Sequence, residues 1–449
     1  MNNVIFKEVD SWGSFARSKS RVQKRYWSCE KLAEPVNPGE KILAYGLGRS
    51  YGDCCQNNNG IIIDCHNMNR ILFFDPETGR VKAEAGLCLD DLLSFCVPRG
   101  WFLHVTPGTK FVTLGGAIAN DVHGKNHHQA GTFGNFVSRF ELLRSDGTKL
   151  ICSETENSAL FNATIGGLGL TGLITWVEMK LKPIRSSAIV VETIKVVNFD
   201  EFLAITKESD TGFEYTVAWL DGLASGKNLG RGIFMRGNHA VPEGVELCPH
   251  RKPLLSIPMD FPELTLNRWT IRAFNFAYYR KQQKRRKRSS VHYDSFFYPL
   301  DSIGRWNRIY GGRGFFQYQF VIPNSERQEP VREIMRIIAS SGEASFLAVM
   351  KSFGTVPSKG MLSFPIPGVT IAMDFPNRGQ STLHMMQKLD QVVMEAGGRL
   401  YPAKDARMSG HVFRKSYPNW EKFCEHIDPK FSSDFWRRVT WQTDGNIFI

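Results

Sequence analysis

The sequence predicts an α+β protein with two structural domains, because the pattern of strand-like and helical runs changes once along the 449-residue chain. Up to about residue 187, short β-rich runs alternate with short helical runs and glycine is dense. From about residue 188, longer strand-like runs and amphipathic helical stretches follow, as expected where helices cover one face of an antiparallel sheet. We therefore expect domains at 1–187 and 188–398, and a separate C-terminal segment at 399–449.

The first domain contains five well-marked elements. Its runs predict strands in GIIIDC (60–65), RVKAEAG (80–86) and GLITWVEMKL (172–181), and a helix in LDDLLSFCVPRG (89–100). The fifth, FELLRSDGTKLI (140–151), carries Asp146-Gly147 between two apolar runs. That pair favours a tight turn, so the segment predicts a β-hairpin.

The second domain is expected to consist of strands covered by helices. Strand-like runs occur in FFQYQFVIP (315–323), SFLAVMKSFG (345–354) and VTIAMDF (369–375). The stretch 381–398 predicts a helix that begins at Ser381 as N-cap and stops at Gly397-Gly398. Its apolar face is Leu383, Met386, Leu389 and Val393.

The positive charge of the chain is local. The formal net charge is +12, but seven Lys and Arg residues lie in RKQQKRRKR (280–288), and without them it is +5. Such a run near 280–290 is typical of a solvated flexible loop. It could instead attract an anionic membrane surface or a phosphorylated ligand. No RNP, zinc-finger or helix-turn-helix pattern accompanies it, so nucleic acid is not expected as a partner.

Cysteine usage and the N-terminal residues favour a reducing, cytoplasmic compartment. Nine cysteines show no C-x-x-C spacing, and an odd number cannot all pair within the chain. The start MNNVIFKEVDSWGSF carries charges where a signal peptide needs an apolar core. NDVHGKNHH (120–128) could offer three histidines to a metal, but further ligands at recognisable spacing are not evident, and we expect no metal site.

Three glycine-rich patches dominate the first domain: AYGLGRSYGD (44–53), PGTKFVTLGGAIANDVHGKN (107–126) and GGLGLTGLI (166–174). Glycine allows the backbone to turn sharply and to present N–H groups to phosphate oxygens. The first patch has G-x-G-x-x-x-G spacing, which is not the Rossmann pattern, and no Walker G-K-S or G-K-T occurs. Three such patches together predict one extended ligand, such as a dinucleotide, bound past several backbone turns.

The same patches carry a family resemblance. The order G-x-G-R-S-Y-G-D, then P-G-T-x-x-V-T-x-G-G-A-I-A-x-D-x-H-G-K-N-H-H, then G-G-x-G-L-T-G resembles FAD-linked oxidoreductases of the vanillyl-alcohol-oxidase type. With SFPIPG (363–368), GFFQYQFVIP (314–323), FYPLD (297–301), WNRIYG (306–311) and GGRLYPAKDAR (397–407), it is most similar to the decaprenylphosphoryl-β-D-ribose 2'-oxidase family. The resemblance implies a PCMH-type FAD-binding domain, an antiparallel-sheet substrate domain covered by helices, and a C-terminal return to the FAD domain.

The resemblance also assigns the FAD contacts. The pyrophosphate loop would consist of Ala44, Tyr45, Gly46, Leu47, Gly48, Arg49, Ser50, Tyr51, Gly52, Asp53 and Cys54. The flavin ring and ribityl chain would contact Gly108, Thr113, Leu114, Gly115, Gly116, Asn120, Asp121, Val122, His123, Ile174 and Tyr401. Some relatives tether flavin to a histidine where this chain has Arg49, and no cysteine lies between 97 and 151. Noncovalent FAD is therefore expected.

The catalytic residues implied by the resemblance are Lys404, His123 and Tyr51. Lys404 would polarise the reacting hydroxyl or stabilise reduced flavin, although a surface pair with Asp405 is the alternative. His123 could relay a proton or serve as a hydrogen-bonded structural group. The substrate pocket would consist of Lys125, Trp219, Tyr298, Gln317, Gln319, Lys351, Thr370 and Ala372. For Trp219 ordinary strand packing is the alternative. Thr370 and Ala372 replace an asparagine and a cysteine of the family, so pocket shape and the response to thiol-directed inhibitors do not carry over.

The function implied is FAD-dependent oxidation of the 2'-hydroxyl of a polyprenyl-phosphoryl ribofuranose. This is half of a ribose-to-arabinose epimerisation, so a short-chain NAD(P)H reductase is the expected partner, with a quinone or other electron acceptor and peripheral contact with an anionic membrane. An aldonolactone or alditol oxidase is the alternative enzyme. A noncatalytic membrane- or nucleic-acid-binding protein with a degenerate flavin site is the alternative of another class.

Overall fold

The computed structural model describes residues 5–441, apart from residue 16 and the segments 33–38, 242–243, 254, 326–327 and 344–345. The first residue of the strand expected at 345–354 and the last eight residues of the C-terminal segment lie outside the described residues. No helix in the described part of the chain is long and apolar enough to span a membrane.

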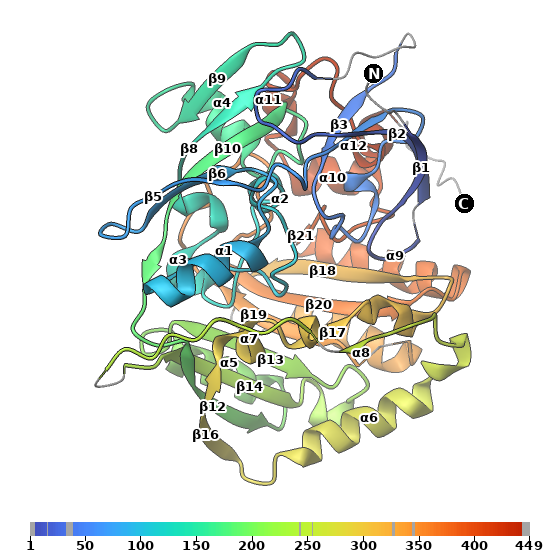
Figure 1. The fold of residues 1–449 in the computed structure, drawn as a ribbon. Helices are drawn as coiled ribbons and strands as arrows, with labels where there is room; N and C mark the ends of the chain where they lie inside the picture. Colours follow the sequence, from blue (N-terminus) through green and yellow to red (C-terminus); the bar gives the residue numbers. More distant parts are fainter. Residues whose placement is uncertain are drawn as a thin grey trace.

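Two sheets form the upper part of the molecule in Figure 1. The four-stranded sheet has the order β1 (Ile5–Asp10), β2 (Arg17–Lys24), β4 (Ile61–Asp64), β3 (Ile42–Tyr45). The five-stranded sheet has the order β5 (Ile71–Phe74), β6 (Arg80–Glu84), β10 (Leu173–Lys180), β8 (Val137–Leu143), β9 (Lys149–Ser153). Its helices are α1 (Leu89–Cys96), α2 (Leu114–Ala119), α3 (His127–Ala130) and α4 (Ser158–Thr164). The hairpin expected at Asp146-Gly147 is confirmed, because Leu143 pairs with Lys149.

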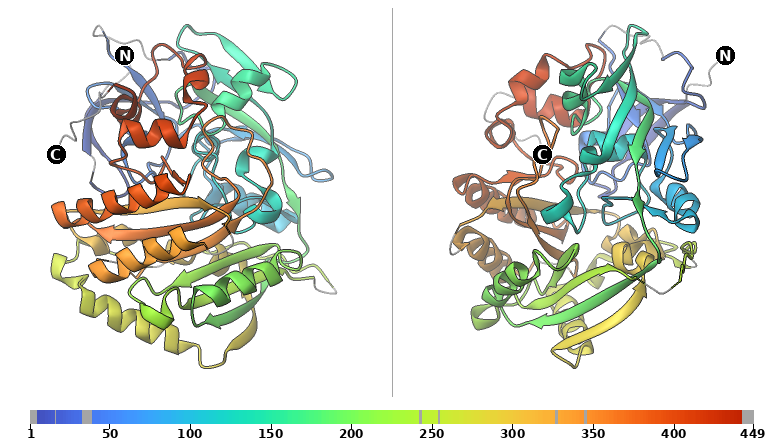
Figure 2. Two further views of the ribbon diagram at one scale, coloured as in Figure 1. Left: turned by 180° about the vertical axis from the view of Figure 1, so that it is seen from behind. Right: turned by 90° about the vertical axis from the view of Figure 1, so that its left-hand side faces the viewer.

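One eight-stranded sheet forms the lower part of the molecule (Figures 1 and 2). Its order is β16 (Arg286–His292), β12 (Ala188–Val196), β14 (Gly232–His239), β13 (Tyr215–Leu220), β19 (Ala348–Phe353), β20 (Gly368–Pro376), β18 (Phe315–Pro323), β21 (Arg399–Leu400). The helices α5 (Phe199–Ser209), α8 (Glu329–Ser341) and α9 (Gln380–Glu395) cover one face. The remaining helices here are α6 (Arg268–Lys281) and α7 (Tyr293–Phe297). Two short pairs complete the strands: β7 (Trp101–Phe102) with β11 (Lys182–Pro183), and β15 (Leu255–Ser256) with β17 (Ile303–Gly304).

Along each strand of the large sheet, successive side chains alternate between the two faces of the sheet. Phe316, Tyr318 and Phe320 of β18 point to the helix-covered core, as do Ile371 and Met373 of β20. In a strand, successive side chains point to opposite faces. The intervening residues therefore share the other face, which turns toward the glycine-rich loops.

The helix expected at 381–398 is present as α9, with one correction at its start. Met386, Leu389 and Val393 are buried as expected. Ser381 lies inside the helix, which begins at Gln380 after Gly379. The stop is as expected, because the helix ends at Glu395 and Gly397 takes a φ of +68°.

The prediction of a flexible loop near 280–290 is wrong for most of the basic run. Lys281 ends α6, and 286–292 forms β16, which pairs with β12 from Ala188 to Ile194. Backbone hydrogen bonds to a neighbouring strand can order a segment whose side chains remain solvated. The charged side chains of 286–288 are exposed although their backbone belongs to the sheet.

The C-terminal segment packs against the first sheet. It contains α10 (Gly410–Ser416), α11 (Trp420–Cys424) and α12 (Asp434–Trp441), and α12 lies beside β2 and β3 in Figure 1. Ile42 donates its backbone N–H to Lys430 at 2.8 Å, and Arg438 pairs with Asp53 at 2.7 Å. The chain thus returns to the glycine-rich domain after completing the large sheet.

Candidate active site

A cavity of about 720 Å³ lies between the glycine-rich loops and the uncovered face of the large sheet. Every residue expected to contact cofactor or substrate lines this cavity except Gly52, Asp53, Leu114, Asp121, Tyr298 and Thr370. These six residues lie outside the lining of the cavity, although the resemblance assigns them ligand contacts. Each of them supports the wall from behind.

The first glycine-rich loop follows β3 and depends on glycine at two points. A Cβ at Gly46 would lie 2.4 Å from the Thr113 hydroxyl oxygen. Gly48 takes a φ of +60°, which disfavours a side chain. Gly52 and Asp53 turn away from the cavity. A Cβ at Gly52 would overlap the backbone of Asp405, and the Asp53 carboxylate pairs with Arg438. These two residues fix the C-terminal segment to the loop.

The second glycine-rich patch, at 107–126, is organised by α2. Its N-cap Thr113 accepts a hydrogen bond from Gly116 N, which turns the small-residue face of the helix to the cavity. Leu114 packs into the core of the five-stranded sheet. The Asp121 carboxylate accepts hydrogen bonds from Gly134 N, at 2.9 Å, and from the Ser363 hydroxyl. Leu114 and Asp121 therefore anchor this patch.

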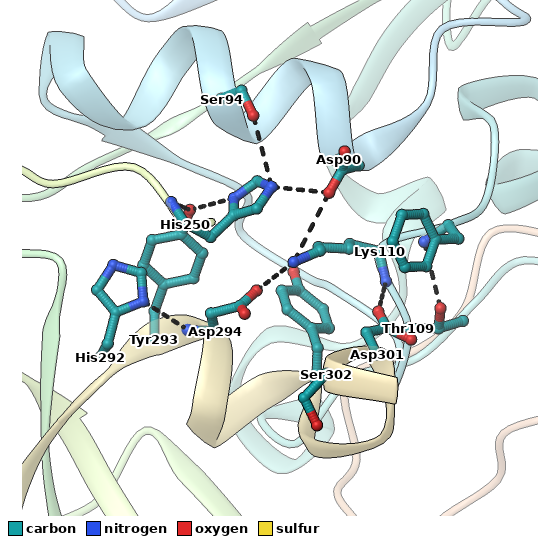
Figure 3. A network of polar contacts seen from close by, with 12 residues as sticks. Asp90, Ser94, Thr109, Lys110, His250, His292, Tyr293, Asp294, Asp301 and Ser302 are labelled. Atoms are coloured by element: carbon teal, nitrogen blue, oxygen red, sulfur yellow. Dashed lines mark hydrogen bonds and ion pairs between the residues drawn. The ribbon is translucent and has the colours of Figure 1, made fainter. Parts of the chain in front are cut away.

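A buried ion-pair network holds the loop that precedes α2 (Figure 3). The Lys110 ammonium, 1% exposed, pairs with Asp294 and lies 3.6 Å from Asp90. Its backbone N–H donates to Asp301 at 2.8 Å, and His250 contacts Asp90 at 2.7 Å. The network thus joins the glycine-rich domain to the segment around α7. Burial raises the pKa of Asp301, which lines the cavity, to about 6.

Alternation in the strands gathers the substrate-side residues on one face. Gln317 and Gln319 of β18 lie across from Asp374 and Ala372 of β20, and Lys351 of β19 lies across from Thr370. The Thr370 hydroxyl donates to the Phe320 carbonyl at 2.7 Å. It therefore supports the sheet.

Two aromatic residues near the pocket have partners of their own. The Tyr298 hydroxyl is bonded to Thr106 at 2.6 Å, with its side chain 1% exposed and out of the cavity. Trp219 does line the cavity, and its indole N–H donates to the Phe346 carbonyl at 2.9 Å. Its ring is therefore held rigidly in the wall.

Lys404 lies in the cavity with its ammonium 3.9 Å from the centre of the Tyr51 ring. Burial lowers the pKa of Lys404 to about 7, with Asp374 opposing the shift and Lys351 adding to it. The alternative of a surface pair with Asp405 is wrong, because Asp405 pairs with Arg438 at 3.0 Å. Lys404 is therefore a partly buried amine that changes charge near neutral pH.

The carboxylate of Asp374 lies behind Gln317. Asp374 accepts hydrogen bonds from Gln317 Nε2 at 2.7 Å and from the Tyr310 hydroxyl at 3.0 Å. Burial raises the pKa of Asp374 to about 7. The acid behind the pocket wall and the Lys404 amine in the cavity thus have similar pKa values and affect each other.

The three histidines of NDVHGKNHH separate in the structure. Gln319 Nε2 lies 3.0 Å from His123 Nε2, and His123 Nδ1 is buried with no hydrogen-bond partner among the described residues. The His127 ring packs 4.3 Å from Phe353, and its buried nitrogens have no such partner either. His128 contacts the Phe213 carbonyl at 3.0 Å. In the described part of the chain no group of three His, Cys, Asp or Glu could hold a metal.

Two further lysines, Lys125 and Lys351, line the same cavity as His123. Lys125 donates to the Phe296 carbonyl and lies 4.4 Å from the Phe296 ring. Burial lowers the pKa of Lys125 to about 7 and that of Lys351 to about 8. Burial, together with nearby Lys351, also lowers the pKa of His123 well below its ordinary value. His123 is therefore neutral at physiological pH.

Comparisons with known proteins agree with this geometry. Residues 32–153 match the family model described as FAD binding domain. The chain is 39% identical over 416 residues to decaprenylphosphoryl-β-D-ribose oxidase of Mycolicibacterium smegmatis, and the match covers 89% of each chain. An uncharacterized protein of Streptomyces coelicolor is 31% identical over 375 residues, which are 79% of this chain and all of that protein. L-gulonolactone oxidase of Mus musculus is 33% identical over 156 residues, or 34% of each chain.

The chain belongs to the decaprenylphosphoryl-β-D-ribose oxidase family. It is an FAD-dependent oxidoreductase with the α+β FAD-binding fold expected from its sequence. The FAD-binding family model covers the first two glycine-rich patches, at 44–53 and 107–126.

The donors and acceptors of the cavity fit the FAD of this family. A Cβ at Gly108 would meet no atom within 4 Å, so the backbone there is open to a ligand that approaches closely. Asn120 Oδ1 and His123 Nδ1 are buried without hydrogen-bond partners among the described residues, and both residues line the cavity. Buried polar atoms of this kind require a partner, which a polar ligand supplies. The Arg49 guanidinium lies 4.4 Å from the Trp12 ring at the same wall.

Sequence reasoning missed two acidic residues of the candidate site. Asp301 lines the cavity, and Asp374 holds Gln317. Both lie in motifs that the sequence already singled out, FYPLD and VTIAMDF. A signal for Asp374 was present, because it has the same strand parity as Thr370 and Ala372.

Proposed function

We propose that this chain oxidises the 2'-hydroxyl of a polyprenyl-phosphoryl-β-D-ribofuranose to the 2'-keto sugar, with noncovalent FAD as the hydride acceptor. The supporting observation is the match to the Mycolicibacterium smegmatis oxidase, which covers 89% of both chains and therefore both the cofactor and the substrate sides of the cavity. Bound FAD would supply the two-electron acceptor that the side chains lack. The side chains would orient the sugar and accept the hydroxyl proton.

Lys404 is the residue best suited to accept that proton. With a pKa of about 7, a fraction of Lys404 is a neutral amine at physiological pH. Loss of hydride from the carbinol carbon requires that the hydroxyl proton leave as well, and Lys404 would take it. The Tyr51 ring beside the ammonium would then stabilise the protonated amine.

His123 has a different role in this proposal. An amide nitrogen donates, so His123 Nε2 accepts from Gln319 and the ring proton lies on Nδ1. The unpartnered Nδ1–H would donate to an oxygen of the sugar or of the flavin. His123 would therefore orient the bound ligand, and proton relay would fall to Lys404. Tyr51 would contact both the flavin and the sugar where the two ligands meet.

The proposal includes partners implied by the chemistry. A keto sugar must be reduced again to complete an epimerisation, which a short-chain NAD(P)H reductase would do. Reoxidation of the flavin requires an acceptor such as a quinone. A substrate with a prenyl chain would bring the protein to a membrane surface, for which we propose the anionic cytoplasmic side.

An absorption spectrum followed by anaerobic titration tests the function. The holoenzyme should show flavin bands that bleach with a short-chain polyprenyl-phosphoryl ribose and persist with free sugars and aldonolactones. Bleaching by a lactone instead would support a sugar-lactone oxidase, which the partial match to L-gulonolactone oxidase makes the second candidate. Colourless protein after refolding with FAD would support a noncatalytic binding role. Flavin remaining in solution after acid precipitation would support noncovalent attachment.

A further inference from the structure

The outer surface of α6 is unusually apolar for an exposed helix. Of its fourteen residues only Ile271 and Asn275 are buried. Trp269 is 75% and Phe276 51% exposed. Trp269 and Phe276 lie seven positions apart and therefore on one face of the helix. Arg272 lies on the same face and is also exposed.

The inner side of α6 is fixed to the large sheet. Asn275 Nδ2 donates to Asp221 at 2.8 Å, and the Tyr278 ring lies 4.6 Å from the Trp219 ring. The exposed face therefore belongs to an ordered helix and lies along the lower right margin of the molecule in Figure 1. Large apolar side chains exposed on an ordered helix are typical of an interaction site.

The segment before α6 extends the same surface. Leu255, Met259 and Leu264 are 72%, 68% and 85% exposed. The segment is tied in place at both ends: β15 pairs Leu255 with Ile303 of β17, and the Thr270 hydroxyl donates to the Thr265 carbonyl at 2.8 Å. We call the exposed residues of 255–281 the apolar face.

Charge on and beside the apolar face is strongly positive. Between 251 and 288 the sequence has eleven Lys and Arg residues and two acidic residues. Those two, Asp260 and Glu263, face arginines: Arg308 at 3.9 Å and Arg313 at 2.7 Å. Basic residues that flank exposed aromatic and aliphatic side chains are the pattern of an interfacial membrane helix.

The outer end of the cavity opens at this face. Phe274 of α6, Ile303 of β17 and the neighbouring Arg305 line the cavity and are also exposed. The same cavity extends inward to Lys404 and the glycine-rich loops. A molecule entering between α6 and β17 would therefore reach the candidate catalytic lysine.

We propose that the apolar face is a docking surface for an anionic lipid bilayer, with Trp269 and Phe276 entering the interfacial layer and the flanking Arg and Lys residues contacting lipid headgroups. Docked in this way, the cavity opens toward the bilayer, and a lipid-linked substrate can pass its sugar inward while its chain stays in lipid. This last step rests on the proposed function. The excess of positive charge along this segment complements the negative headgroups of an anionic bilayer.

Vesicle co-sedimentation of the FAD-loaded, full-length protein tests the proposal. We expect binding to phosphatidylglycerol-containing vesicles and much weaker binding to pure phosphatidylcholine vesicles. The double variant Trp269→Ser/Phe276→Ser should reduce the affinity by about tenfold or more. Arg272→Gln and Arg280→Gln should each reduce it by roughly fivefold, and high salt should have the same effect.

Matched controls separate this surface from general stickiness. Phe6→Ser and Leu72→Ser remove exposed apolar side chains, 73% and 45% exposed, from β1 and β5 of the other domain. They should leave vesicle binding unchanged. Flavin bleaching by a soluble short-chain substrate should be unchanged in all of these variants, so loss of docking and failure of the proposed oxidation can be told apart.

Three results would overturn the proposal. The first is no vesicle binding, or equal binding to neutral and anionic vesicles. The second is binding that survives both Trp269→Ser/Phe276→Ser and the arginine variants. The third is a dimer in sedimentation velocity that Trp269→Ser/Phe276→Ser dissociates, because the face would then serve a second copy of the chain.

Discussion

The ammonium nitrogen of Lys404 lies 3.9 Å from the centre of the Tyr51 ring. The ring stabilises the charged amine, whereas burial disfavours it and dominates, so that the pKa of Lys404 falls to about 7. The two effects together keep both protonation states populated at neutral pH. A proton acceptor in alcohol oxidation needs this property.

Removal of this amine should abolish turnover without loss of the cofactor. We expect Lys404→Met to lower kcat with the short-chain phosphoryl ribose by ~100-fold or more, since no other group in the proposal takes the hydroxyl proton. The flavin spectrum should persist. Stopped-flow reduction of the flavin measures the effect directly, and an unchanged reduction rate would assign the proton to another group.

The charges near Lys404 should move the pH profile in opposite directions. The neutral amine is the active form, so kcat/KM should rise with pH through an acid limb near pH 7. Asp374 raises the pKa of Lys404 and Lys351 lowers it. Asp374→Asn should therefore shift the acid limb to lower pH and Lys351→Met to higher pH, each by roughly one unit.

This pair of variants provides its own control. Both change a charged residue on adjacent strands of the large sheet. A loss of structure would lower activity at every pH and leave the midpoint in place. Profiles of kcat/KM for the two variants beside wild type show which occurs. Midpoints that move in the same direction would refute Lys404 as the titrating group.

The sequence predicted the glycine-rich patches and the covered sheet because both depend on local patterns. Gly46 and Gly48 mark a backbone that must turn, and the alternation in FFQYQFVIP places Gln317 and Gln319 on one face. Local patterns do not show which polar partner a side chain finds. Tyr298 was expected in the pocket, but Thr106, distant in sequence, takes its hydroxyl.

The basic run shows a second limit of local reasoning. Its composition is typical of a loop, but the exposed edge of β12 offers backbone hydrogen bonds that order 286–292 as a strand. Asp374 shows a third. Its role comes from Tyr310 and Gln317, and only the folded sheet brings those residues to it.

Close approach of the backbone to FAD predicts the effect of a side chain at Gly108. A Cβ there meets no protein atom within 4 Å, so Gly108→Ala should leave the thermal stability of the apoprotein unchanged. Because the methyl group points into space that the ligand would use, FAD affinity should fall by about tenfold. Fluorescence titration with FAD measures it. Gly212→Ala, which also meets no atom within 4 Å but lies outside the cavity, should bind FAD as wild type does.

The network around Lys110 should be important for stability. Lys110→Met would leave Asp90 and Asp294 facing each other without the buried ammonium that both contact. Breaking a buried ion pair from one side costs about 3–5 kcal/mol, so the free energy of unfolding in urea should fall by that amount. Lys207→Met on the exposed surface of α5 is the matched control and should change it little. Because the loop at 106–112 lines the cavity, Lys110→Met should also bind FAD more weakly. If Lys110→Met were as stable as Lys207→Met, the network would contribute no net free energy to folding.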